Sequence, residues 1–397
     1  MRPNASVIAN SNVKKLGEVC KIINGFFFPK SVLELIANQV PYAKATDIVV
    51  NHLTSTNASV LNKLVQKRNA EIANKGAFLI VLTGASIGQI ATLDIDAILD
   101  PNLCAVINEW LEDLDNQFLY FFLLVNVPFL LHQTKTSDRI QSIQLKDLTI
   151  RIPPIATQRK LVKEVSEKIT RIDAAIHTLQ QQVTAAKVEK QQIIDNAFTH
   201  DMSIIATQIN RINLSLIANI QAGNTPTESM AVYYANEYAF FKPEDIFQGE
   251  NMITSKTQVS TRGAKVARLI MPNALLVVTS GSLIGKVGIT RIKATCNRSL
   301  TAIMPYKDVS AEFLYFQFQS QAIQNQIRAA AIRSIITKSK LSAIQCIIVP
   351  TATQSTIIKF LQKKLQIINA NIRETQTQID KLTQEKEHLL IATFRAE

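Results

Sequence analysis

The sequence has few residues that could form cross-links or hold a metal ion. Its four cysteines, Cys20, Cys104, Cys296 and Cys346, are scattered and show no C-x-x-C spacing. This pattern argues against a disulfide framework and against a zinc site, and it fits a reducing cytosol. The sequence also lacks a run of 18 apolar residues and a hydrophobic block near its first residue. We therefore expect a cytoplasmic protein that is neither exported nor membrane-spanning.

Motifs that bind nucleotides or metals are missing as well. Gly281 and Gly285 have three residues between them where a phosphate loop has four, and Val287 stands where that loop has its hydroxyl. No G-x-G-x-x-G follows a predicted strand, and the five histidines are dispersed with no H-E-x-x-H. We expect no catalytic residues in this chain, and no cofactor or metal bound by it.

Positive charge is concentrated in one part of the 397 residues, whose formal net charge is +12. Residues 202–350 contain 15 Lys and Arg against 7 Asp and Glu, whereas residues 1–152 contain 14 against 13. Such a concentration favours a polyanionic partner, and a nucleic acid first of all. The alternative is a basic surface that is merely solvated, and charge alone does not separate the two.

The second half of the sequence repeats the first about 196 residues later. Residues 152–158 (IPPIATQ) recur as residues 348–354 (IVPTATQ). The repeat is too long for a solenoid unit of about 20–50 residues, so it represents a domain plus a helix that is used twice. This predicts globular domains at 1–152 and 202–350, followed by helices at 153–201 and 351–397.

Both helical segments carry apolar residues at alternating spacings of three and four, which is the a/d seam of a coiled coil. Neither segment contains Pro or Gly, and Thr157 and Thr353 follow a proline as predicted N-caps. Each helix should have about 40 residues and a length of roughly 60 Å. The seam positions include Val165, Ile169, Ile172, Ile176, Leu179 and Val183 in the first helix, and Leu361, Leu365, Ile368, Ile372, Ile379 and Leu382 in the second.

Lys190 and Lys386 occupy equivalent seam positions where an apolar residue is expected. A polar residue in a coiled-coil core can fix register and partner choice at a cost in stability. Alternatively, each lysine extends from a fraying seam into water. The occurrence of a lysine at this seam position in both copies slightly favours the first interpretation.

The two globular segments read as mixed α/β. Apolar runs at residues 77–82 and 274–278 predict buried strands. Each run is followed by a turn with two glycines, at residues 83–90 and 280–287. The predicted fold is therefore two α/β (α+β) domains that alternate with two long helices, and the helices pair as an antiparallel coiled coil.

This arrangement resembles the DNA-specificity subunit of type I restriction–modification systems over nearly the whole chain. The opening L-G-x-[IV] is Leu16 to Val19, with Gly25 and Pro29 downstream, and the P-P-x-x-x-Q motif is Pro153 to Gln158. A G-x-[IL]-G turn follows a strand in both copies. The second copy departs from the pattern at Ser215 and Val349. The markers are specific because they occur in the same order twice.

The resemblance implies a subunit without activity of its own that binds a bipartite double-stranded DNA target. Each target-recognition domain would read one half-site, and the antiparallel helices would hold the domains apart. The complex would include two methyltransferase subunits, which modify an adenine in each half-site, and two motor-nuclease restriction subunits. S-adenosylmethionine, ATP and Mg are expected in those partner subunits and not in this chain.

Basic, amide and hydroxyl side chains in loops are the candidates for contact with DNA, because Lys and Arg bind phosphates, Arg binds guanine, and Asn or Gln binds adenine. The glycine turns recur in domains that would read different sequences, so they should shape the backbone or meet phosphate. The candidates are Lys30, Lys44, Ser86, Gln89, Lys135, Arg139 and Gln141 in the first domain, and Lys242, Ser282, Lys286, Arg298, Arg328, Arg333 and Lys338 in the second.

Helix length would set the unread spacer, because domains held roughly 40–60 Å apart match half-sites about one to one and a half DNA turns apart. Deleting about one helical turn from residues 170–190 should then change the allowed spacing.

Two other hypotheses remain. In one, the seams make this a coiled-coil interaction scaffold that does not bind specific DNA. In the other, the chain is an enzyme with an unrecognised site. Salt-dependent DNA affinity would separate the first from a DNA-binding subunit, and activity of the purified chain alone would support the second.

Overall fold

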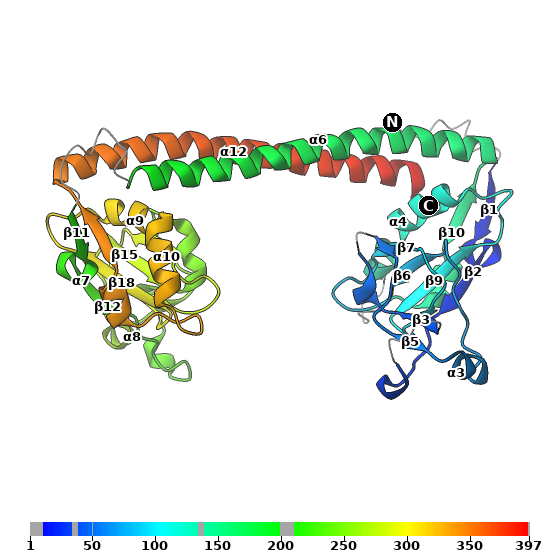
Figure 1. Ribbon diagram of the computed structural model, residues 1–397, viewed down its shortest axis with the longest axis horizontal. Helices are drawn as coiled ribbons and strands as arrows, with labels where there is room; N and C mark the ends of the chain where they lie inside the picture. The colour runs from blue at the N-terminus through cyan, green and yellow to red at the C-terminus, as the bar shows by residue number, and fades with distance from the viewer. Residues whose placement is uncertain (1–10, 34–38, 50, 134–138, 199–209, 396–397) are drawn as a thin grey trace. The chain divides into compact units, whose positions relative to one another are not determined.

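The computed structural model describes residues 11–33, 39–49, 51–133, 139–198 and 210–395. It divides into two compact units, residues 1–178 with 378–397 and residues 179–377. Each unit therefore contains one globular domain and parts of both long helices, α6 (Ile155–Asn196) and α12 (Thr351–Phe394). Figure 1 shows the chain coloured by residue number, from blue at the N-terminus to red at the C-terminus.

The domain of the first unit contains two sheets and a ribbon. The larger sheet has the order β2 (Cys20–Asn24), β9 (Leu103–Asn108), β6 (Phe78–Val81), β7 (Ile90–Leu93) and β4 (His52–Leu53). The smaller sheet has the order β5 (Ser59–Val60), β3 (Val40–Ala43) and β8 (Ile98–Leu99), and β1 (Asn12–Lys15) pairs antiparallel with β10 (Thr149–Ile152). The helical elements are α2 (Leu16–Val19), η1 (Lys30–Val32), η2 (Ala45–Asp47), α3 (Asn62–Lys67), α4 (Asn116–Gln133) and α5 (Ser142–Asp147).

The second domain repeats this topology strand for strand, apart from a counterpart of β4. Its larger sheet has the order β12 (Ala218–Ala222), β18 (Leu300–Pro305), β15 (Ala274–Val278) and β16 (Val287–Thr290). Its smaller sheet has the order β14 (Gln258–Val259), β13 (Tyr238–Phe241) and β17 (Ala294–Cys296), and β11 (Asn210–Asn213) pairs with β19 (Gln345–Ile348). The helical elements are α7 (Leu214–Ile217), η4 (Ala231–Tyr233), η5 (Pro243–Gln248), α8 (Thr261–Ala267), α9 (Ala311–Gln319), α10 (Gln321–Ala330) and α11 (Lys338–Ser342).

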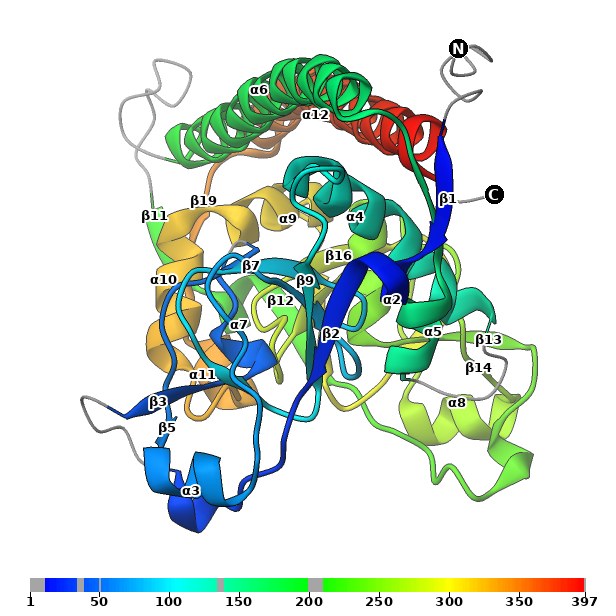
Figure 2. The same cartoon turned by 90° about the vertical axis from the view of Figure 1, so that its right-hand side faces the viewer.

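The predicted strands form the centres of the larger sheets. Every residue of β6 and of β15 is buried, which explains why both read as continuous apolar runs instead of alternating ones. In the first unit, α4 lies between the sheet and the long helices (Figure 1, Figure 2). The Tyr120 ring of α4 is 5.6 Å from that of Phe78 in β6.

The long helices pair antiparallel within each unit. In the first unit, Val165 near the start of α6 shares an apolar cluster with Leu390 and Phe394 at the end of α12. In the second unit, Ile194 near the end of α6 clusters with Leu361 near the start of α12. The ring of Phe394 lies 5.1 Å from that of Phe121 in α4, so the end of α12 packs on the first domain.

The prediction that Thr157 and Thr353 are N-caps is wrong. The helices begin two residues earlier, at Ile155 and Thr351. The backbone N–H of Thr157 already donates to the Pro154 carbonyl at 2.8 Å, so Thr157 lies inside the first turn. Pro154 and Pro350 directly precede the first helical residues. Their missing N–H costs no hydrogen bond there, because the first N–H groups of a helix have no acceptor within the helix.

Candidate nucleic-acid interface

The glycine turns after β6 and β15 have the same backbone in both units. Gly84 and Gly281 have φ angles of 92° and 95°, and Gly88 and Gly285 have φ angles of 82° and 84°. Residues with a side chain rarely adopt these positive φ angles, so glycine is needed to close the turn. The N–H groups of Gly88 and Gly285 donate back to the preceding strands, at 2.8 and 2.9 Å.

Each turn is joined to the loop that precedes a short helix, α5 or α11. In the first unit, Thr83 forms a β-bridge with Arg139, and Ile140 N–H donates to the Leu82 carbonyl at 2.9 Å. In the second, Ser280 forms a bridge with Ile335. We call each combination a turn–loop site, made of residues 83–89 with 139–141 in the first unit and 280–286 with 332–338 in the second.

The turn–loop sites bring together eight of the sequence-predicted candidates. They are Ser86, Gln89, Arg139 and Gln141 in the first unit, and Ser282, Lys286, Arg333 and Lys338 in the second. Arg298 lies beside the second site, because its neighbour Ser299 accepts a hydrogen bond from Thr279 N–H at 2.8 Å. All of these side chains except Gln89 are exposed.

A hollow of about 240 Å³ adjoins the first turn–loop site, lined by Asn24, Gly25, Leu82, Pro101, Arg139, Ile140, Gln141 and Ser142. A Cβ on Gly25 would lie 1.9 Å from the Asp100 carbonyl oxygen, and one on Gly223 would lie 2.1 Å from that of Asn297. The downstream glycine of the opening motif is therefore required by a close backbone approach at the same place in both domains.

Other predicted candidates lie away from these sites. Lys44 and Lys242 precede η2 and η5, and their backbone N–H groups donate to Asp47 and Asp245 at 2.9 Å in each case. Both copies thus have a lysine followed three residues later by an aspartate that caps the turn. Lys30 is exposed in η1, and Lys135 lies outside the described residues.

The arginine candidates differ in how their guanidinium groups are used. Arg139 donates to the Pro101 carbonyl at 2.8 Å. Arg328, on α10, donates to Gln321 at 3.1 Å and to Asn325 at 2.5 Å. Within the part of the chain that the structure describes, the guanidinium groups of Arg298 and Arg333 have no hydrogen bond or ion pair.

Sequence reasoning missed the role of one glutamine in each copy of the helix motif. Gln158 is fully buried: its side chain accepts from Asp115 N–H at 2.9 Å and donates to the carbonyls of Asp113 and Pro153. Gln354 makes the same three contacts, with Ser310, Asp308 and Val349. These amides join each domain to the start of its helix. The recurrence of Gln at this position in both copies was the sequence signal that could have predicted this structural role.

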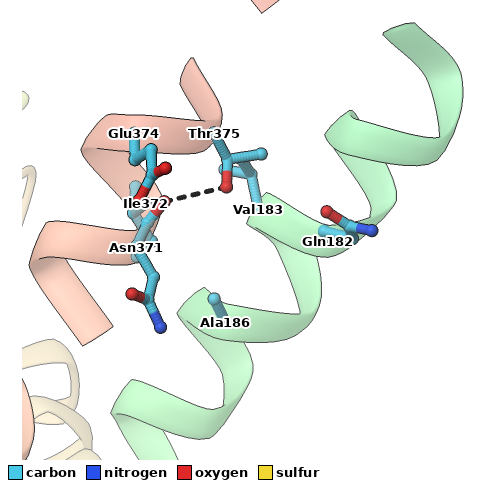
Figure 3. Close-up of a pocket in the computed structure, with 7 residues that line it drawn as sticks. All are labelled: Gln182, Val183, Ala186, Asn371, Ile372, Glu374 and Thr375. Atoms are coloured by element: carbon cyan, nitrogen blue, oxygen red, sulfur yellow. Dashed lines mark hydrogen bonds between the residues drawn. The ribbon is translucent and has the colours of Figure 1, made fainter. Parts of the chain in front are cut away.

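The predicted seam residues lie on the facing sides of the helices. Val165, Ile172, Val183, Leu361, Leu365, Ile368 and Ile379 are buried, and Ile169, Ile176, Leu179, Ile372 and Leu382 are half-buried. In the second unit a hollow of about 310 Å³ lies along the seam, lined by Gln182, Val183, Ala186, Asn371, Ile372, Glu374 and Thr375 (Figure 3). The Thr375 hydroxyl donates to the Asn371 carbonyl of its own helix at 2.8 Å and does not cross the seam.

The seam lysines reach polar partners on the facing helix. Lys386 Nζ lies 2.7 Å from a carboxylate oxygen of Asp173, and Lys190 Nζ donates to Asn369 Oδ1 at 2.9 Å. Burial lowers the pKa of Lys190, the charge of Glu250 raises it, and the charge of Lys286 lowers it.

No grouping of three or more His, Cys, Asp or Glu suited to a metal ion occurs among the described residues. The four cysteines are unpaired and buried, and burial raises the pKa of each thiol to about 12. Among the described helices, none combines the length and apolarity needed to cross a membrane.

Comparisons with known proteins agree with the repeated architecture. The MjaIX type I restriction enzyme specificity subunit of Methanocaldococcus jannaschii is 23% identical over 137 residues, which are 34% of this chain and 32% of that protein. The HindI specificity subunit of Haemophilus influenzae is 25% identical over 182 residues, 45% of this chain and 39% of that protein. The matched segments thus span less than half the length of these relatives.

A solved structure that concerns complex assembly and conformational transition of the type I R-M system contains a similar fold. Its TM-score is 0.76 at 16% identity, and the match covers 100% of this chain and 99% of that chain. A family model described as the type I restriction modification DNA specificity domain matches residues 9–185 and 209–381. Because these two matches include most of the sequence, the chain belongs to the family of type I restriction–modification DNA specificity domains.

Proposed function

We propose that the chain is the DNA-recognition subunit of a type I restriction–modification complex and that each domain binds one half of a bipartite double-stranded target. The observation that supports this most is the turn–loop site, which is built twice with the same glycine angles and the same bridge to the loop before a short helix. The side chains around it differ between the copies. A shared backbone with different side chains suits two domains that read two different half-sites.

In this proposal the paired helices hold the domains and provide the surface for the partner subunits. Two methyltransferase subunits and two motor-nuclease subunits would bind the chain, and S-adenosylmethionine, ATP and Mg would be bound by those partners. The chain itself would be non-catalytic, and its contribution would be the choice of DNA sequence.

The two domains differ in net charge, so they should contribute unequally to phosphate binding. Residues 202–350 have an excess of eight basic residues, whereas residues 1–152 have an excess of one. The second domain can therefore attract DNA by itself, while the first would depend on its methyltransferase partner for much of the phosphate contact.

Methylation mapping tests this proposal. Genomic DNA would be sequenced for modified adenines from cells that carry this gene together with the neighbouring methyltransferase gene, and from cells that carry either gene alone. A split motif that requires both genes is the expected result. The absence of any gene-dependent motif, with both proteins expressed and soluble, would contradict the proposal.

Salt dependence separates this function from that of a protein scaffold. DNA affinity of the assembled complex should fall steeply as salt rises, with a log–log slope that corresponds to several phosphate contacts. A scaffold protein that binds DNA only non-specifically would bind weakly. It would show no preference between the mapped motif and a scrambled duplex of equal length.

A further inference from the structure

Residues 332–335 form a two-residue hairpin turn at the second turn–loop site. Ile332 N–H donates to the Ile335 carbonyl at 2.9 Å, and Ile335 N–H donates to the Ile332 carbonyl at 3.0 Å. The two central residues, Arg333 and Ser334, have φ angles of 50° and 60°. A turn with two positive φ angles in succession is of type I′, which strongly favours Asn-Gly. Neither residue here is of the kind that this turn prefers.

The positive φ angles of Arg333 and Ser334 are strained, and hydrogen bonds from the neighbouring glycine turn maintain them. A non-glycine residue in the left-handed region is strained, because its Cβ comes too close to the following carbonyl oxygen. The neighbouring glycine turn maintains this conformation, because Gly281 N–H donates to the Ser334 carbonyl at 3.1 Å and Ile336 N–H donates to the Thr279 carbonyl at 2.9 Å. Strain that the surroundings maintain in this way is concentrated at functional sites.

The hairpin presents one free guanidinium group between two apolar side chains. Arg333 is exposed and, unlike Arg139 and Arg328, has no intramolecular partner among the described residues. Ile332 and Ile335 are 63% and 53% exposed. An unpaired arginine with adjacent exposed isoleucines matches the edges of DNA bases better than phosphates, because phosphate binding does not need apolar neighbours.

We propose that Arg333 is a specificity-determining residue for the half-site read by the second domain. A two-stranded hairpin fits into the major groove, where arginine donates to O6 and N7 of a guanine and apolar side chains contact a thymine methyl group. The hydrogen-bonded turn fixes the backbone from which the Arg333 side chain extends. The inference rests on the proposed function and adds to it the residue and the base that it reads.

The test uses the full-length chain assembled with its methyltransferase and a randomised bipartite DNA pool, with methylation of the selected sequences as a second measurement. Arg333→Ala should lose preference for one guanine of a single half-site by about 10- to 100-fold, since a bidentate contact contributes about 1–3 kcal/mol. The other half-site should be unchanged. Arg211→Ala is the matched control, because Arg211 is an exposed arginine of the same domain that lies in β11, outside the turn–loop site, and it should retain the wild-type motif.

A second variant separates reading from folding. Arg333→Asn with Ser334→Gly installs the preferred pair for this turn, so the melting temperature should rise while the same guanine preference is lost. Ser334→Gly alone should retain the motif.

Two results would overturn the inference. One is an unchanged motif in Arg333→Ala, and the other is an equal loss of affinity for all sequences, which marks a phosphate contact. If the wild-type complex selects no motif at all, the proposed function fails and the inference fails with it.

Discussion

At the scale of single residues, the seam lysines show how one residue type meets different partners in the two copies. Asp173 and Asn369 occupy equivalent positions in the repeat, so Lys386 faces a carboxylate while Lys190 faces an amide. The register of the antiparallel helices is the same in both units. An amide accepts a hydrogen bond from the ammonium but does not neutralise it, and burial lowers the pKa of Lys190.

Asn369→Asp should stabilise the protein by giving Lys190 a carboxylate. The expected gain in the free energy of unfolding is about 0.5–1 kcal/mol at low salt, and it should decrease at high salt. Asp173→Asn is the reciprocal variant, and it should lose stability at the other pair. Calorimetry of both variants in low and high salt measures the effect. A loss of stability in Asn369→Asp would show that its added desolvation exceeds the attraction.

The direction of the Lys190 pKa also predicts a pH dependence. Because the folded-state pKa lies below the usual 10.5, the unfolded chain binds more protons between the two values. Stability contributed at this position should therefore rise with pH as the pH increases through the folded pKa towards 10.5. In Asn369→Asp this rise should diminish. Thermal unfolding of both proteins from pH 7 to pH 10 measures it, and parallel curves would contradict the assignment.

Gln158 supports a residue-scale prediction about the junction of domain and helix. Gln158→Leu leaves the N–H of Asp115 and two carbonyls without their buried partner, so the free energy of unfolding should fall by about 1–3 kcal/mol or more. Gln181→Leu, at an exposed position of the same helix, should be nearly neutral. If the two variants unfold at the same temperature, the amide does not hold the junction.

At the scale of elements, the helices and strands that could be predicted were those marked by hydrophobic periodicity or by a following glycine turn. The 3-4 spacing located both long helices, and apolar runs located β6 and β15, because burial imposes those patterns directly. The I′ hairpin at Arg333 and Ser334 could not be predicted, since neither residue favours it and a contact with the distant glycine turn imposes it. The turn-capping bonds from the backbones of Lys44 and Lys242 to Asp47 and Asp245 could not be predicted either, because the sequence does not show which carboxylate accepts a backbone N–H.

The hollow along the seam of the second unit predicts a stabilising substitution. Thr375→Ile should fill part of the hollow beside Ala186 and raise the free energy of unfolding by about 0.5–2 kcal/mol. Thr377→Ile is the matched control, because Thr377 is exposed on the same helix and makes the same hydrogen bond to its own backbone. Differential scanning calorimetry of the full chain should show a higher transition only for Thr375→Ile. A gain of equal size in both variants would indicate an effect of helix propensity instead.

At the scale of the whole molecule, the duplication gives each domain the same kind of attachment. The first domain contacts the start of α6 through Gln158 and the end of α12 through Phe394, whose carbonyl accepts from Asn126 at 2.8 Å. The second contacts the start of α12 through Gln354 and the turn that follows α6 through Phe198, whose ring lies 5.6 Å from that of Phe313. Both ends of each helix are therefore anchored, and a change in helix length should be transmitted to the domains.

Helix length should consequently set the number of unread base pairs between the half-sites. Removing residues 176–182 together with 377–383 deletes one heptad from each helix, retains the a/d phase and leaves both lysine pairs intact. One heptad shortens a helix by about 10.5 Å, or about three base pairs at ~3.4 Å each. Methylation should shift to shorter spacers while both half-site sequences stay the same. It should also be weaker, because three base pairs turn a half-site by roughly 100°. A deletion within residues 170–190 alone, which the sequence suggested as the test, is not sufficient, because the contacts Lys190–Asn369 and Lys386–Asp173 fix the register of one helix against the other. Removing only residues 176–182 should therefore disrupt the seam and abolish methylation at every spacing. A paired deletion that methylates the original spacing would show that the helices do not act as the ruler.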